Sequence, residues 1–213
     1  MTTTEIWHAR TVGEATCAAL KKNGFDARFV ETAEQAADYI ESVVTAGASV
    51  GLGGSMTIRA LELKDRLENK GARLLDHSAQ GLSAEQKMDV MRAQLSCDVF
   101  LSSSNAITMK GELYNIDGNG NRVAAITFGP KKTIVVAGFN KIVRDLEEAE
   151  ARLEGIASPM NNQRLGTGNP CTNSGVCMDC KSETRICRIY SVMKRRPSRS
   201  DFTVIIVGER LGY

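Results

Sequence analysis

Four cysteines lie close together late in the sequence and carry its most specific chemical pattern. The spacing C-x5-C-x2-C-x6-C places them at Cys171, Cys177, Cys180 and Cys187. Thiolates bind zinc and iron–sulfur clusters, and the short C-x-x-C arm lets two sulfur atoms reach one centre. We therefore predict a metal site with these four ligands, holding zinc or an iron–sulfur cluster. Four reduced structural thiols, or a redox-active pair, are the alternative.

Basic residues are concentrated around the end of this cysteine segment. Between residues 181 and 200, seven lysines and arginines stand against Glu183 alone, and the rest of the chain is mildly acidic. Lys181, Arg185 and Arg188 could offset the charge of four thiolates or form a docking face. Because the positive charge is confined to one segment, we do not expect nucleic-acid binding.

A second candidate site is the glycine-rich stretch from Gly51 to Thr57, between a predicted strand and a predicted helix. Backbone amides at the start of a helix lack intrahelical acceptors, and glycines let an anion approach them closely. The predicted anion-binding residues of this turn are Gly51, Gly53, Gly54, Ser55 and Thr57. A phosphate, pyrophosphate or carboxylate would fit. The alternative is a purely structural tight turn in which Ser55 caps the helix.

The turn does not match the common nucleotide-binding motifs. No Gly-Lys-Ser/Thr follows it, and Met56 stands where the dinucleotide fingerprint has its third glycine. Asp76, at the end of the next predicted strand, is near the position of a ribose-binding acid in the dinucleotide motif. Nucleotide binding is therefore left open.

Polar residues also follow other predicted strands, and the carboxyl ends of parallel strands share one edge of the sheet. We expect Asn105, Arg122, Asn140 and Lys141 to help bind an anion at that edge. For proton transfer, the candidates are Asp117 and Glu112. Asp117-Gly118 and Asn119-Gly120 are also what a hairpin turn requires, which is the alternative. The lone histidines His8 and His77 are expected to be structural or exposed, and the absence of Gly-x-Ser-x-Gly disfavours serine hydrolase chemistry.

The elements that must position these residues alternate between helix and strand, which predicts an α/β fold with a mostly parallel sheet and helices on both faces. The expected helices are 8–23, 33–44, 58 to near 71, 84–95 and 141–153. The expected strands are 27–30, 48–52, 73–76, 98–102, 112–116, 122–128, 133–137 and 202–207. Strands 112–116 and 122–128 should form an antiparallel hairpin. Residues 158–200 are expected to be a loop-rich, basic cysteine insert within a single domain of residues 1–213.

Length and composition exclude several protein classes. The chain has 213 residues, ordinary proportions of apolar and charged residues, and apolar runs no longer than a strand, so no membrane association is expected. The first residues lack the apolar core of a secretory signal, and we predict a cytoplasmic protein. Six cysteines are too few for a disulfide scaffold, and Cys17 and Cys97 are expected to be core thiols.

Several segments together resemble a known family, the LUD domain found in lactate utilization protein C. They are Gly51-Leu52-Gly53-Gly54-Ser55, Ser104-Asn105-Ala106-Ile107-Thr108, Gly111-Glu112-Leu113-Tyr114-Asn115-Ile116-Asp117-Gly118, Asn121-Arg122-Val123 and Gly138-Phe139-Asn140-Lys141-Ile142-Val143. The resemblance implies a fold similar to ribose-5-phosphate isomerases and coenzyme A transferases. It also implies work alongside iron–sulfur subunits that oxidise L-lactate to pyruvate. The cysteine insert looks like one found in a subset of the family.

Two functions therefore remain open. The chain is either an accessory protein or subunit of an iron–sulfur system for lactate oxidation, or a stand-alone isomerase or transferase for a sugar phosphate or a coenzyme A-linked substrate. Both require a small anionic ligand at the Gly51 turn. Whether the chain is catalytic by itself, and whether it forms a homo-oligomer, are left open.

Overall fold

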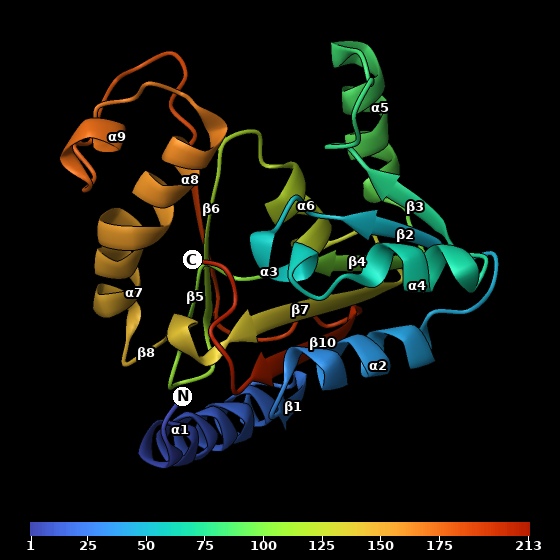
Figure 1. Ribbon diagram of the computed structural model, residues 1–213, viewed down its shortest axis with the longest axis vertical. Helices are drawn as coiled ribbons and strands as arrows, with labels where there is room; N and C mark the ends of the chain where they lie inside the picture. The colour runs from blue at the N-terminus through green and yellow to red at the C-terminus, as the bar shows by residue number, and fades with distance from the viewer.

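The computed structural model describes residues 1–213 and contains a six-stranded sheet in the order β1-β10-β7-β4-β2-β3, with every neighbouring pair parallel (Figure 1). In that order the strands are β1 (Asp26–Val30), β10 (Asp201–Val207), β7 (Lys132–Gly138), β4 (Val99–Ser102), β2 (Ser49–Leu52) and β3 (Arg73–Asp76). The predicted α/β class and parallel sheet are confirmed. The last strand in sequence, β10, lies inside the sheet between β1 and β7.

Helices cover both faces of this sheet, as predicted. One face carries α1 (Thr3–Lys22), α5 (Ala84–Gln94) and α6 (Asn121–Thr127), and the other carries α2 (Ala33–Val43), α3 (Met56–Arg59) and α4 (Leu63–Asn69). Side chains of a strand alternate between the two faces. In β7, Ile134 and Val136 pack with α2 to α4, whereas Val135 and Ala137 pack with α1 and α6. A strand buried on both faces explains the unbroken apolar run.

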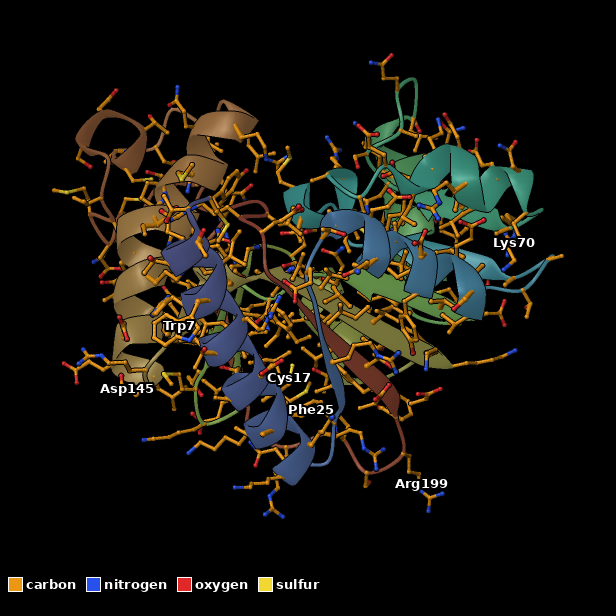
Figure 2. All side chains as sticks on the ribbon, turned by 60° about the horizontal axis from the view of Figure 1, so that its bottom comes forward. Trp7, Cys17, Phe25, Lys70, Asp145 and Arg199 are labelled. Carbon is orange, nitrogen blue, oxygen red and sulfur yellow. The ribbon has the colours of Figure 1, made fainter.

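Helix α1 lies across its face of the sheet (Figure 2). Cys17 of this helix and Phe25, which follows the helix, both belong to the hydrophobic core on that face. Phe25 packs edge-on against Phe202 of β10, with ring centroids 5.1 Å apart. Burial raises the pKa of the Cys17 thiol to about 12 and that of Cys97 to about 11. Both are therefore core thiols, as expected.

A second sheet stands beside the first, in the order β8-β5-β6-β9. Its strands are β8 (Ile142–Val143), β5 (Ala106–Thr108), β6 (Leu113–Asp117) and β9 (Ile189–Met193). Helices α7 (Leu146–Arg152), α8 (Ser158–Leu165) and α9 (Cys171–Ser174) form the left-hand column of Figure 1, and the C-terminus lies between this part and the main sheet. None of the helices is long and apolar enough to cross a bilayer.

The predicted hairpin is wrong. Residues 122–128 do not form a strand, because Asn121–Thr127 is helix α6, and β6 pairs instead with β5 and β9. Gly120, with φ 81°, turns the chain into this helix, and a carboxylate oxygen of Asp117 accepts the amide hydrogen of Val123 in its first turn. Asp117 thus stabilises the first turn of a helix, although the Asp-Gly and Asn-Gly pairs had predicted a hairpin turn.

Other boundaries also differ from the prediction; α1, for example, begins at Thr3 rather than at residue 8. The helix expected at 141–153 begins only at Leu146, after Asp145 as N-cap, because Ile142–Val143 is strand β8. The segment expected to be loop-rich contains α9, β9 and also α8, which continues α7 through a π-helical turn at Leu153–Ala157. The helix expected from 58 is divided into α3 and α4 at Glu62, whose φ is 49°.

Candidate functional site

A cavity of about 630 Å³ lies at the carboxyl ends of β2, β4 and β7. Its volume is in the range of small-molecule sites. The main sheet contributes Gly53 and Gly54 after β2, Ser103 after β4 and Lys141 after β7. Helix α8 and the cysteine segment form another wall, which includes Cys187. The cavity is thus where ligands of parallel sheets usually bind.

Lys141 is the most unusual residue of this cavity. It is only 4% exposed, and its Nζ donates hydrogen bonds to Thr57 Oγ1 at 2.9 Å and Ser103 Oγ at 3.0 Å. It forms no ion pair within the protein. Burial, followed by the positive charges of Arg152 and Arg122, lowers the pKa of Lys141 to about 7. The amine therefore changes its charge near neutral pH.

Arg122 holds the loops around the cavity together. Its guanidinium pairs with Asp117 at 2.7 Å. It also donates to Asn105 Oδ1 at 2.8 Å, to Asn115 Oδ1 at 2.7 Å and to the carbonyl oxygen of Ser103 at 2.9 Å. One residue of α6 thereby fixes the segments after β4 and within β6. Because Arg122 and Asp117 are bonded to each other, their charges largely cancel.

Positive charge remains in excess around the cavity. Arg152 is buried near enough to Lys141 for its charge to act on that lysine, and its guanidinium bonds to backbone carbonyl oxygens of Asn140 and Asn105 rather than to a carboxylate. Burial lowers the pKa of Arg152 to about 10. Of the three cations Arg122, Lys141 and Arg152, only Arg122 has an acidic partner, and the charges of the buried Lys141 and Arg152 are not compensated within the protein. Such a region attracts an anion.

The glycine-rich turn adds hydrogen-bond donors. The amide hydrogens of Gly54, Ser55 and Met56 have no acceptor within the protein, and all three residues line the cavity. Gly54 has φ 68°, which a glycine adopts without strain. Ser55 also caps α3, since its hydroxyl accepts from Ile58, so the structural role that we considered is real. Helix α3 has only four residues, so the unbonded amides matter more than a helix dipole.

The cavity brings together most of the predicted ligand-binding residues. Those that line it are Gly53, Gly54, Ser55, Asn105, Arg122 and Lys141. Thr57 is buried behind the cavity and holds Lys141, whereas Gly51 lies within β2 and is not part of the lining. Asn140 bonds to Leu211 and Gly212, which keeps the C-terminal segment in place.

The two predicted acids are in different places. Asp117 lines the cavity, but its oxygens accept from Arg122 and from the amide of Val123. Glu112 precedes β6, at the opposite end from Asp117, and accepts from Thr108 Oγ1 outside the cavity. Glu112 therefore lies outside the cavity, because β6 separates it from Asp117.

The sequence profile of the LUD domain matches residues 13–207, which include both sheets and the cavity. The chain belongs to the LUD domain family. Among solved structures, the chain is similar to a DUF162 family protein from Deinococcus radiodurans, with a TM-score of 0.52 and 15% identity. The match covers 97% of this chain and 99% of that one, and at this identity it shows the fold alone. No curated protein matches in sequence.

The cysteine segment of this LUD domain lies against the cavity. Cys171 and Cys187 are buried, and Cys177 and Cys180 are half-buried. Burial raises the pKa of Cys171, and the neighbouring thiols of Cys187, Cys180 and Cys177 raise it further. Cys177 Sγ accepts the amide hydrogen of Asp179 at 3.4 Å, and hydrogen bonds from Ser182 lower the pKa of Cys180. The four thiols are therefore neighbours, although no three acidic, histidine or cysteine side chains are arranged to hold a metal ion.

Sequence reasoning gave no role in the cavity to several of its lining residues, among them His77 and Tyr213, and did not expect Arg152 to be buried. His77 lines the cavity beside Gly54, and burial lowers its pKa, so it is neutral at pH 7. Tyr213 also lines the cavity and donates to Asn161 Oδ1 at 3.2 Å. Arg152 was missed because its only sequence signal was a place in a charged helix, where exposure is the usual outcome.

Proposed function

We propose that this LUD domain binds a small carboxylate in the cavity and serves lactate utilization, the process with which its family is associated. In this role the chain is an accessory protein or subunit of an iron–sulfur system that oxidises L-lactate to pyruvate. Lactate and pyruvate are both small carboxylates. Either would bring the negative charge that the cavity lacks.

The uncompensated charge of Lys141 is the observation that carries this proposal. A buried ammonium group without an anion costs several kcal/mol, by order of magnitude, and proteins retain such groups mainly where they work. A carboxylate near Nζ would accept a hydrogen bond from it and restore the balance of charge. The unbonded amides of Gly54, Ser55 and Met56 could bind the other carboxylate oxygen.

Binding and protonation should be coupled in this site. A carboxylate near Lys141 favours the ammonium form and raises the lowered pKa of the lysine. Above neutral pH, ligand binding should therefore take up a proton. In the absence of the ligand, the amine loses its proton more easily.

A ligand screen by thermal unfolding tests the proposal. Lactate and pyruvate should raise the melting temperature of the wild type, because a ligand at about 100 times its Kd stabilises by about 2.7 kcal/mol. The shift should disappear in Lys141→Met and persist in Lys110→Met, which changes an exposed lysine. No shift with any small carboxylate, or equal shifts in both variants, would contradict the proposal.

A larger anionic substrate is the second candidate, and the size of the cavity favours it. About 630 Å³ exceeds what a three-carbon acid fills, and Arg164 and Arg188 line the part formed by α8 and the cysteine segment. A sugar phosphate or a coenzyme A-linked substrate could reach these arginines while its anionic group binds near Lys141. Ribose 5-phosphate and coenzyme A therefore belong in the same screen. A larger shift with either than with lactate would favour an isomerase or transferase.

A related proposal concerns the four cysteines as ligands of zinc or an iron–sulfur cluster. Their donor set and proximity fit such a site, and the amide hydrogen of Asp179 already bonds to Cys177 Sγ. Small movements of the half-buried Cys177 and Cys180 would be needed to complete it. When bound, zinc would stabilise the fold of the cysteine segment, whereas an iron–sulfur cluster could transfer electrons.

Elemental analysis with an absorption spectrum on anaerobically purified protein tests this metal site. Iron with broad visible absorption indicates a cluster, and stoichiometric zinc in a colourless sample indicates a structural site. Cys177→Ser should abolish the metal content, whereas Cys97→Ser, which changes a core thiol, should keep it. Metal-free wild type would contradict ligation. Copurification with iron–sulfur proteins tests the partner subunits.

A further inference from the structure

The nitrogen of Lys141 has two hydroxyl neighbours that already donate their own hydrogens elsewhere. Thr57 Oγ1 donates to the carbonyl oxygen of Leu211 at 3.1 Å, and Ser103 Oγ donates to that of Ser104 at 3.2 Å. Both hydroxyls therefore accept from Nζ. A neutral amine has two hydrogens and one lone pair, so these two bonds use its hydrogens and leave the lone pair unbonded.

The neutral form of this amine is accessible near pH 7. Burial and the charges of Arg152 and Arg122 lower the pKa of Lys141 to about 7, and no carboxylate holds the proton. Lysines that act as nucleophiles are activated in this way, by desolvation and by neighbouring cations. Lys110, by contrast, is exposed to solvent.

The amine of Lys141 and the unbonded amides of the glycine-rich turn belong to residues that line the same cavity. Lys141, Gly54, Ser55 and Met56 all line it, and Thr57, whose hydroxyl touches Nζ, follows Met56 directly. A small carboxylate bound by these amides would share the cavity with Nζ. In a 2-oxo acid the carbon next to the carboxylate is a carbonyl carbon.

We propose that Lys141 forms an imine with a small 2-oxo acid bound in this cavity. The lone pair of Nζ attacks the carbonyl carbon, the new N–C bond forms, and the π electrons move to the carbonyl oxygen. Nitrogen gives up two protons, and the C–O bond breaks as the oxygen leaves with them as water. No oxidant or reductant is consumed. This inference rests on the carboxylate site proposed above and names 2-oxo acids as its ligand class.

Borohydride trapping with pyruvate tests the imine. Sodium borohydride reduces the C=N bond, so the wild type should gain the mass of pyruvate less one oxygen atom, carried by the peptide that contains Lys141. Lys141→Arg keeps a positive charge but cannot form this imine, and it should lose the label. Lys110→Arg should keep it. If Lys141→Arg does not fold, the peptide map of the wild type decides the result.

Lactate separates failure of the imine from failure of the carboxylate site, because it has the carboxylate but no carbonyl group. Trapping at Lys141 supports the inference, whether or not lactate raises the melting temperature. Stabilisation by lactate and pyruvate without trapping leaves the carboxylate site standing and overturns the imine. Label spread over exposed lysines, at equal levels in Lys141→Arg, also overturns it. If neither stabilisation nor trapping is observed, both proposals are contradicted.

Discussion

The amino nitrogen of Lys141 lies 3.0 Å from the hydroxyl oxygen of Ser103, and this hydrogen bond connects the segments that follow β7 and β4. Lys141 is only 4% exposed, and its nitrogen has no acidic partner. Its charge therefore costs stability that the folded chain does not recover internally. An anion in the cavity would reduce that cost, which links the stability of the protein to its ligand.

Replacing the buried amine with an apolar side chain should stabilise the protein without its ligand. Near pH 6, Lys141→Met should raise the free energy of unfolding by about 1–3 kcal/mol, because it removes an unpaired buried charge and retains the volume. Urea unfolding measures this change. Lys110→Met, at an exposed position, should change stability by less than about 0.5 kcal/mol. A clear loss of stability in Lys141→Met would show that the ammonium group is already compensated.

The pH dependence of stability should reveal the same residue. The folded pKa of Lys141 is about 7, well below the ordinary lysine value, so the unfolded chain binds more protons above pH 7. The contribution of Lys141 to stability is therefore least favourable below the folded pKa and rises with pH toward the unfolded pKa. The slope is at most about 1.4 kcal/mol per pH unit. Urea unfolding from about pH 6 to pH 9 should show this rise in the wild type relative to Lys141→Met. Parallel curves would refute the lowered pKa.

The ion pair between Arg122 and Asp117 should be important for the loops of the cavity. Arg122→Met should lower the free energy of unfolding by about 3–5 kcal/mol, because it leaves a buried carboxylate and several oxygens without their donor. Arg92→Met is the matched control, since Arg92 pairs with Asp89 on the surface. It should cost less than about 1 kcal/mol. Similar losses in both variants, measured in urea, would contradict the assigned role.

The break between α3 and α4 offers a test of backbone strain. Glu62 has φ 49° and makes no capping hydrogen bond with its side chain, so Glu62→Gly should stabilise by about 0.5–1 kcal/mol. Lys64→Gly, two residues later within α4, should destabilise by a similar amount, about 0.5–1 kcal/mol. Thermal unfolding of both variants measures the contrast. Destabilisation by both would show that Glu62 is not strained.

Much of the sheet could be predicted from local patterns. The β7 and β10 runs are apolar on both faces, and the turn after β2 combines glycines with hydroxyls, so the position of the proposed anion site followed from parallel pairing. Lys141 was named for this reason. Its burial was not predictable, because it depends on Thr57, Ser103 and the C-terminal Leu211, which lie far apart in sequence.

The failures have identifiable causes. Asp117-Gly118 and Asn119-Gly120 are typical of a hairpin, but the carboxylate of Asp117 caps α6 instead, and Ala125 and Ile126 pack on the main sheet. At Asp145 a capping signal was available, since its side chain accepts from Glu148, and it would have corrected the start of α7. The burial of Arg152 depends on tertiary contacts with Asn105 and Asn140.

Calorimetric titration of lactate into the wild type and Lys141→Met tests the central claim most directly. At about pH 6 the wild type should bind lactate, and at about pH 9 its affinity should fall by at least about tenfold as Lys141 loses its proton. Lys141→Met should show no binding at either pH. Equal affinity in the variant, or wild-type affinity that does not change with pH, would contradict a carboxylate site built on this lysine.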